Sequence, residues 1–290
     1  MAETLRSRSA APWLLSLPAL MLFLALLVVP LGLTAVLSFN VFDSMRGLQS
    51  GYTWANYAVV FNDGYYYAIF LRTAVMALGV TVFCATIGIP ETLILARMRA
   101  PWRGLFLLVI LGPMLISVIV RTLGWSILLS NHGLVNTMLE SLGIIDGPIR
   151  FLFSMLGIVI ALTHVLVPFM VIAVWSALQK FDTQAEHAAR SLGASSISTF
   201  WRVVFPQLMP GVLSGSIIVF ALSASAFATP SIIGGRRVKV VTTAVYDEFL
   251  NSMNWPLGAT IAILLLVANV LIIMGCNRII ERRYKQVFAS

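Results

Sequence analysis

Residues 151–179 read FLFSMLGIVIALTHVLVPFMVIAVWSALQ and contain no Asp, Glu, Lys or Arg. A helix that crosses the hydrocarbon core of a bilayer needs about 20 consecutive, mostly apolar residues. This stretch is long enough for one crossing and too short for two. It therefore predicts a transmembrane helix, which we expect over residues 153–178.

Similar runs recur along the chain. The two longest contain their own breakers, Pro30 with Gly32 in the first and Pro206 with Pro210 in the other. The pattern therefore predicts an all-α integral membrane protein with one transmembrane domain over residues 1–290. Its six expected helices cover roughly 11–38, 69–95, 104–129, 153–178, 211–229 and 257–277.

Composition excludes the other broad classes of protein. Of the 290 residues, 59% are hydrophobic and 10% are charged, and the mean hydropathy is +0.95. Soluble domains carry about 25% charged residues, and a soluble protein of this length could not bury so much apolar surface. Intrinsic disorder needs low hydrophobicity and high charge, which is the opposite composition.

The net charge is +8, from 19 basic and 11 acidic residues. Such an excess often indicates nucleic-acid binding. Here the basic residues lie in short clusters between apolar runs, as the cytoplasmic loops of membrane proteins do, so we expect no nucleic-acid partner. The positive-inside rule favours both termini in the cytoplasm, with a minority of basic residues outside: Arg46, Arg150, Arg236, Arg237 and Lys239. A cleaved signal peptide over 1–30 is the alternative, but its apolar core is too long and no A-x-A site follows.

Motifs for catalysis and metal binding are missing from the sequence. There is no GxxxxGK[ST] P-loop, HExxH or GxSxG, and the three histidines, His132, His164 and His187, lie far apart. His164 with Ser154 or Ser176 is the basis for an intramembrane-enzyme hypothesis, against which a hydrogen-bonded polar residue in a helix bundle is the simpler interpretation. We expect no catalytic residue, metal site or cofactor in this chain.

Two charged residues lie within expected helices, where a charged side chain is energetically unfavourable because the bilayer solvates it poorly. Arg121 lies seventeen residues after Gly104, or ~26 Å along a helix, which predicts a place near the external surface. There it lines a vestibule or snorkels to the interface. Glu91 follows Pro90 at the inner end of the second span, where Arg97 or Arg99 can pair with it.

Residues 179–211 read QKFDTQAEHAARSLGASSISTFWRVVFPQLMPG, which predicts two short helices separated by a glycine stop and followed by a proline-led return into the membrane. Asp182 or Thr183 can cap the first helix, and Gly193 suits its left-handed end. Ser195 or Ser196 can cap the second helix. The apolar residues Ile197, Phe200 and Trp201 predict docking, either on the protein's own helix ends or in a groove of a cytoplasmic partner.

This segment resembles the EAA loop of ABC-importer permeases. That pattern is EAA, three residues, Gly, nine residues and I-x-L-P, and it aligns with His187-Ala188-Ala189, Gly193, Val203, Phe205 and Pro206. The Glu of the family falls on His187, with Glu186 one position earlier. The resemblance implies that the cytoplasmic loop 180–210 couples ATP hydrolysis to transport through Glu186, His187, Ala188, Ala189, Gly193, Ala194, Phe200 and Pro206.

The resemblance also implies a type I importer (MetI-like) permease in a bacterial inner membrane. ATP and Mg²⁺ would bind to a separate dimer of ATP-binding subunits. A second homologous permease would complete the membrane part, with the first helix of each wrapping its partner. A periplasmic substrate-binding protein would deliver cargo, and membrane lipid would surround the spans.

Further stretches are similar to spermidine/putrescine permeases of the PotB type: VIVRTLGW at 118–125, GLVN at 133–136, FATPSIIGG at 227–235, YDEFL at 246–250 and NWPLG at 254–258. Permeases for aminoethylphosphonate, opines, thiamine or iron share much of this pattern. The resemblance therefore implies import of a polyamine-like solute, with another small solute as the alternative.

Charge on the expected outer side permits both kinds of substrate. A polyamine pathway needs carboxylates and aromatic faces, which Trp125, Tyr246, Asp247 and Glu248 can supply. Arg121 and the basic cluster 236–239 on the same side suit an organic anion or an acidic protein surface. An ion-coupled secondary transporter is the alternative class, but it calls for a midplane carboxylate and an inverted repeat, and neither is visible.

Overall fold

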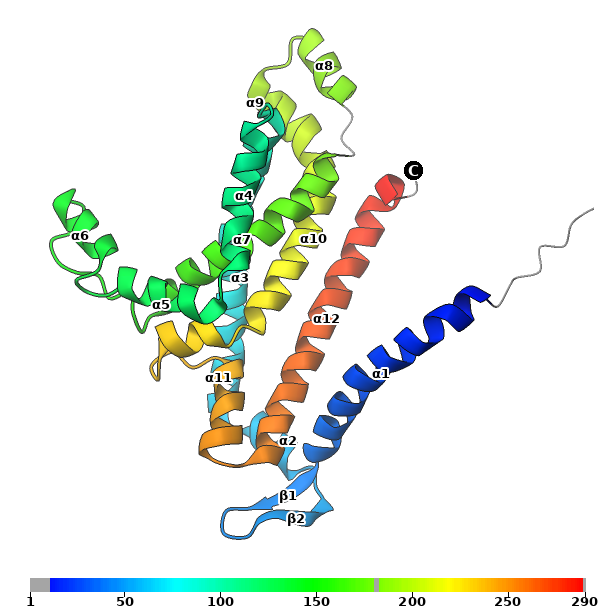
Figure 1. Ribbon diagram of the computed structural model, residues 1–290, viewed down its shortest axis with the longest axis vertical. Helices are drawn as coiled ribbons and strands as arrows, with labels where there is room; N and C mark the ends of the chain where they lie inside the picture. The colour runs from blue at the N-terminus through cyan, green and yellow to red at the C-terminus, as the bar shows by residue number, and fades with distance from the viewer. Residues whose placement is uncertain (1–10, 180–182, 289–290) are drawn as a thin grey trace, which may run out of the picture. The chain divides into compact units, whose positions relative to one another are not determined.

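The computed structural model describes residues 11–179 and 183–288, and the described part is almost entirely helical (Figure 1). Its elements, with three π-helical turns labelled η, are α1 (Ala11–Leu37), β1 (Asn40–Asp43), β2 (Gly47–Tyr52), α2 (Ala55–Asn62), α3 (Gly64–Arg97), α4 (Trp102–Leu115), α5 (Val118–Leu128), α6 (Leu134–Ser141), α7 (Met155–Leu178), α8 (Thr183–Ser191), α9 (Ser196–Thr199), η1 (Phe200–Val204), α10 (Phe205–Ala224), η2 (Pro230–Gly234), α11 (Val241–Tyr246), η3 (Asp247–Asn251) and α12 (Trp255–Phe288). The expected cap Asp182 lies outside the described residues, as does the side chain of Thr183.

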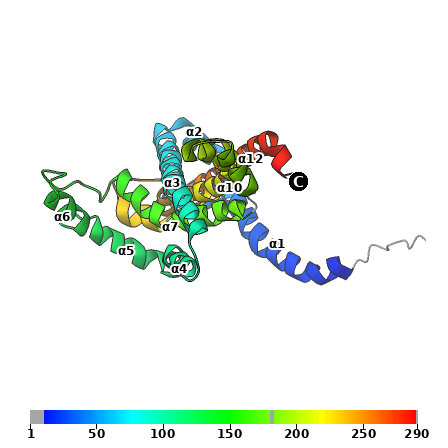
Figure 2. The same cartoon turned by 90° about the horizontal axis from the view of Figure 1, so that it is seen from above.

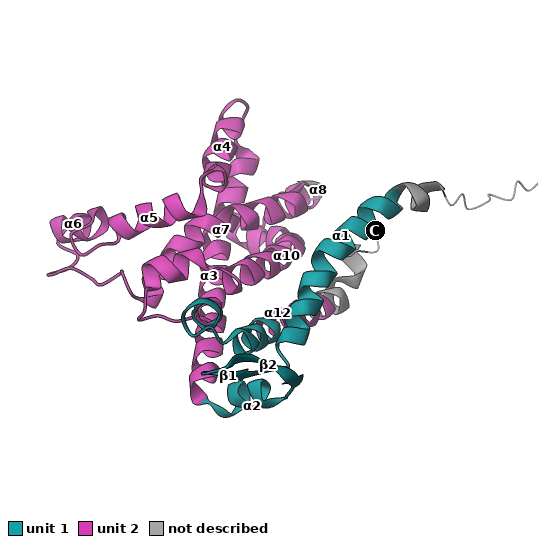
Figure 3. Ribbon diagram, turned by 60° about the horizontal axis from the view of Figure 1, so that its bottom comes forward, with its two compact units in different colours: residues 1–63, 245–264 teal, residues 64–244, 265–290 magenta. Residues whose placement is uncertain are grey.

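Within the described ranges, five helices are long and apolar enough to cross a membrane, or six if the bent pair α4 and α5 counts as one span. The chain divides into two compact units (Figure 3). One comprises residues 1–63 and 245–264, and the other comprises residues 64–244 and 265–290.

The core of the larger unit forms around α7, which packs against both α3 and α10 (Figure 2). Glycines let these helices approach closely: a Cβ added at Gly88 would lie 2.9 Å from Met170, and one at Gly211 would lie 2.6 Å from the Cβ of Ala177. In lipid, helix association depends on such close van der Waals packing, because the tails are as apolar as the side chains. The glycines therefore set the spacing of the bundle.

The expectation of one continuous helix over 104–129 is wrong. Two helices, α4 and α5, replace it, and they meet at a bend of 99°. Ile116 and Ser117 between them have extended ψ angles of 139° and 134°, which end the helical hydrogen bonding. Pro113 in the last turn of α4 contributes, since proline has no amide hydrogen to donate.

The fifth helix also departs from its expected limits of 211–229. The apolar helical run starts at Ser196, passes through the π-helical turn η1 and ends at Ala224. Pro206 lies directly after the π-helical turn η1, in the first turn of α10, and the helical run continues through it. After Ala224 the chain leaves the helix and re-forms a single π-helical turn, η2.

In the smaller unit, Ser38 joins the end of α1 to two other helices, α2 and α12. Its hydroxyl lies 2.8 Å from the hydroxyl of Tyr57, and its carbonyl accepts hydrogen bonds from Asn56 Nδ2 at 2.8 Å and Thr260 Oγ1 at 3.1 Å. The antiparallel hairpin β1–β2 follows directly. These bonds fix the end of α1. The apolar stretch of α1 from Ser16 to Leu37 has no residue buried within the chain. Such exposure is expected for a helix that faces lipid or another chain.

Candidate functional site

The segment with the EAA-like pattern folds as a helix–turn–helix. The helix α8 ends at Ser191, and Gly193, two residues further on, has φ +82°. The Gly193 amide donates to the Arg190 carbonyl at 3.0 Å, and the Ala194 amide donates to the Ala189 carbonyl at 3.1 Å, the paired bonds of a Schellman motif. The Ser195 hydroxyl then caps α9 by accepting from the Ser198 amide at 3.3 Å. The glycine turn and the serine cap occur where the sequence places them.

This helix–turn–helix leaves part of its apolar surface uncovered. Ile197 is 75% exposed and Trp201 is 58% exposed, whereas Phe200 packs against the core of the bundle. The rings of Trp201 and Phe205 lie 4.9 Å apart. Of the two docking alternatives, Phe200 follows the first, because it packs on the protein's own helices. Ile197 and Trp201 remain available to a partner.

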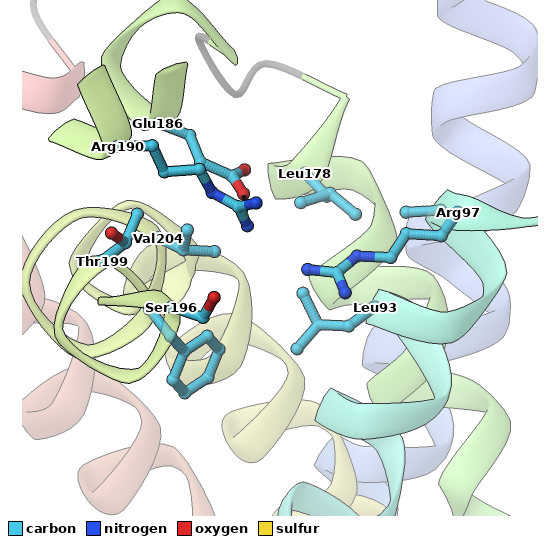
Figure 4. Close-up of a pocket in the computed structure, with 10 residues that line it drawn as sticks. Leu93, Arg97, Leu178, Glu186, Arg190, Ser196, Thr199 and Val204 are labelled. Atoms are coloured by element: carbon cyan, nitrogen blue, oxygen red, sulfur yellow. Dashed lines mark hydrogen bonds and ion pairs between the residues drawn. The ribbon is translucent and has the colours of Figure 1, made fainter. Parts of the chain in front are cut away.

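A cavity of about 460 Å³, here called the α8 cavity, lies between the helix–turn–helix and the ends of α3 and α7. Glu186 and Arg190 on its wall form an ion pair of 2.7 Å, one helical turn apart. Figure 4 shows this pair and Arg97 of α3 extending into the cavity from different sides. Charged groups from α8 and from a transmembrane helix thus share one space.

A second cavity of about 320 Å³, here called the Arg121 cavity, lies between α5, α7 and α10. Arg121 lines it and is 9% exposed, so the snorkelling alternative is wrong. Its guanidinium Nη1 donates to the Pro113 carbonyl at the end of α4. Nearby, the hydroxyls of Thr122 and Thr229 lie 3.2 Å apart and join α5 to the segment before η2.

A third cavity, also about 320 Å³, lies between α3, α5 and α7, and is here called the Glu91 cavity. Trp125 lines it and donates from its indole Nε1 to His164 Nδ1 at 3.2 Å. Glu91 lines it as well, and within the described residues Glu91 forms no ion pair with Arg97 or Arg99, so the expected pairing is wrong. A carboxylate inside a span could have signalled a site from the sequence.

The hydrogen bonds around His164 disfavour the enzyme hypothesis. The imidazole is bonded to Trp125, while the Ser154 hydroxyl caps α7, accepting from the Gly157 amide at 3.1 Å and donating to the Phe151 carbonyl at 2.7 Å. No group of three His, Cys, Asp or Glu among the described residues is placed to hold a metal ion.

The remaining substrate candidates lie elsewhere. Tyr246, Asp247 and Glu248 lie at the end of α11 and in η3, within the smaller unit, where the Asp247 carboxylate accepts from Asn251 Nδ2 at 2.8 Å. Arg121 and Trp125 belong to the larger unit. The five candidates therefore do not form one cluster within either unit.

Comparisons with known proteins identify the family. Residues 9–286 match the model of the "Binding-protein-dependent transport system inner membrane component" family. The chain is 30% identical over 259 residues to the spermidine/putrescine transport system permease protein PotB of Haemophilus influenzae, covering 88% of this chain and 90% of that protein. The PotB protein of Salmonella typhimurium is 32% identical over 253 residues, covering 86% and 88%.

A solved structure has the same fold. A chain of the bacterial alginate ABC transporter, crystallised in complex with alginate pentasaccharide-bound periplasmic protein, superposes with a TM-score of 0.72 at 17% identity, covering 95% of each chain. The long apolar helices and these relatives make the protein a multi-pass protein of the inner membrane, with a transport role rather than an enzymatic one. The chain belongs to the binding-protein-dependent transport system inner membrane components, as the permease subunit of an ABC importer.

Proposed function

We propose that this chain, as a single permease domain with both termini in the cytoplasm, imports a polyamine of the spermidine/putrescine class. It would pair with a second permease and receive the substrate from a periplasmic binding protein. A separate dimer of ATP-binding subunits, holding ATP and Mg²⁺, would drive alternating access. The PotB relatives support the substrate class, and the alginate transporter, solved with its periplasmic protein, supports that partner.

The observation that carries the coupling role is the α8 helix–turn–helix. Its first helix ends in a fixed glycine turn, and its second runs without interruption into α10, so a push on α8 would reach a transmembrane helix. The residues that we propose to contact the ATP-binding subunit are Glu186, His187, Ala188, Ala189, Gly193 and Ala194. Phe200 and Pro206 would transmit the motion, because they lie where α9 joins α10.

The substrate pathway that we propose runs beside α5, near the Arg121 cavity and the Glu91 cavity. Trp125 offers a ring face for a cation. Tyr246, Asp247 and Glu248 would act at the outer side. Arg121 supports a second candidate, import of an organic anion, because its buried Nε has no hydrogen-bond partner among the described residues.

The test is purification of the tagged chain in mild detergent from the membranes of its own host, with mass spectrometry of its stoichiometric partners. We expect an ATP-binding subunit and a second permease. Reconstitution of that complex in liposomes, with its binding protein, then measures ATP hydrolysis driven by spermidine, putrescine or an organic anion such as aminoethylphosphonate.

Stimulation by spermidine or putrescine alone would support the polyamine proposal. Stimulation by the anion alone would replace it with the second candidate. Recovery of the chain without any ATP-binding subunit, under conditions that preserve a known importer, would contradict the coupling role.

A further inference from the structure

We propose that the Glu91 cavity is a binding site for an ammonium group of the transported amine inside the membrane. The proposal rests on the proposed import of a polyamine and adds to it a residue, Glu91, that the sequence reasoning assigned to a structural ion pair. It concerns one cavity, which is lined by α3, α5 and α7.

The cavity has one continuous wall from a single helix. Phe83, Ile87 and Glu91 recur every four residues along α3 and so lie on the same face. They span eight residues, or about 12 Å of helix at the standard rise. Thr163 and His164 of α7 line the cavity as well. The result is a slot with a carboxylate at one end of its α3 wall and an aromatic ring at the other.

Charge decides which ligand the slot accepts. The Oε2 atom of Glu91 is buried and has no hydrogen-bond partner among the described residues. An unpaired carboxylate oxygen in an apolar site is unfavourable, and either a proton or a cationic companion relieves it. No Lys or Arg lines this cavity.

The hydrogen bond between Trp125 and His164 keeps the opposite wall uncharged. The indole donates to Nδ1 of His164, so that nitrogen carries no proton and the imidazole is neutral with its proton on Nε2. A cation entering the slot therefore meets one carboxylate and two aromatic side chains among the described lining residues, while Arg121, close enough to act electrostatically on His164, lines the neighbouring cavity. Ring faces and a carboxylate are the groups that bind ammonium ions best.

The test uses the complete complex with its binding protein, reconstituted in proteoliposomes, with spermidine and putrescine as probes. Glu91→Gln removes the charge and keeps the shape. We expect the KM for transport to rise about tenfold or more, or kcat to fall as much. Glu91→Asp should retain part of the transport. Glu140→Gln is the matched control, since Glu140 is an exposed carboxylate on α6.

A second variant distinguishes loss of the binding site from misfolding of the Glu91→Gln variant. Ile87→Trp fills the slot and keeps the Glu91 carboxylate in the chain, so it should block transport in a complex that assembles normally by size-exclusion chromatography. The readout specific to charge is the transport ratio of spermidine to N-acetylspermidine. Glu91→Gln should lower this ratio, which a purely structural defect would leave unchanged.

Three outcomes would overturn the proposal. Wild-type kinetics in Glu91→Gln, with wild-type import of spermidine intact, would refute this site alone. Loss of the second permease from Glu91→Gln, with an unchanged amine ratio in the complexes that remain, would assign the carboxylate to an interface between permeases. Failure of the wild-type complex to import any amine would refute the proposed substrate class and this site together.

Discussion

The guanidinium of Arg121 donates a hydrogen bond to the carbonyl of Pro113 across the 99° bend that separates α4 from α5. The Pro113 carbonyl also accepts a long backbone hydrogen bond from the Ile116 amide, at 3.4 Å. Carbonyls in the last turn of a helix lack their regular intrahelical donor, and in an apolar environment each needs a donor. Arg121 supplies one from the second helix of the bent pair. The bend and the buried cation therefore stabilise each other.

Arg121→Met should lower the free energy of unfolding by about 1–3 kcal/mol, because a buried carbonyl loses its charged donor. The measurement is the midpoint temperature of the purified complex in detergent. Arg121→Lys should lower the midpoint temperature less than Arg121→Met, since lysine keeps a hydrogen-bond donor. Arg236→Met, which changes an exposed arginine, is the control, and equal midpoints for it and Arg121→Met would contradict the role given to this bond.

Gly193→Ala should reduce the amount of substrate transported per ATP hydrolysed. The φ of +82° at this position is unfavourable for an L-residue by about 1–2 kcal/mol, although a Cβ there would meet no atom within 4 Å. The effect would therefore come from the backbone alone. Gly193→Asn should reduce the substrate transported per ATP hydrolysed by less than Gly193→Ala, because Asn tolerates left-handed conformations.

The matched control for Gly193 is Gly112→Ala in α4, where a Cβ also meets nothing within 4 Å and φ is not positive. Transport and ATP hydrolysis are measured on the same proteoliposomes. If Gly193→Ala kept the same coupling ratio as Gly112→Ala, the turn would have no part in coupling.

Gly211→Ala should push α10 away from α7. The added Cβ would lie 2.6 Å from the Cβ of Ala177 and 2.9 Å from the carbonyl oxygen of Ala173, and neither is a flexible side-chain end. Overpacking of this kind destabilises by about 1–3 kcal/mol. A thermal scan of the purified chain checks this against Gly275→Ala, where nothing lies within 4 Å. A stable Gly211→Ala variant would show that the two helices can separate at little cost.

Thr73→Val should loosen the start of α11. The Thr73 hydroxyl donates to the Ile69 carbonyl at 2.7 Å and accepts from the Val241 amide at 2.9 Å. Valine keeps the shape but leaves the buried amide unpaired, at about 1–3 kcal/mol. Hydrogen exchange at the Val241 amide should accelerate, and Thr73→Ser should restore protection.

Thr81→Val provides the comparison for Thr73. Among the described residues, the Thr81 hydroxyl bonds only to the Ala77 carbonyl of its own helix, at 2.7 Å, so its removal leaves no distant donor without an acceptor. We expect near wild-type stability. Equal destabilisation by the two variants would mean that the remote bond to Val241 contributes nothing.

The sequence by itself determined the features that depend on neighbouring residues. Apolar runs as long as 151–179 must be helices in lipid, since no other single segment satisfies its backbone there. The turn at Gly193 and the cap at Ser195 were predictable for the same reason, because their hydrogen bonds join residues within one or two turns.

Only the tertiary structure decided the features that depend on distant residues. Local patterns favoured one helix through 104–129 and a pairing of Glu91 with nearby arginines. The bend between α4 and α5 places Arg121 in a cavity with residues of α7 and α10, and Glu91 shares a cavity with Trp125 and His164 of other helices. Sequence spacing gives no measure of such proximity, because packing between helices, rather than position along the chain, brings these groups together.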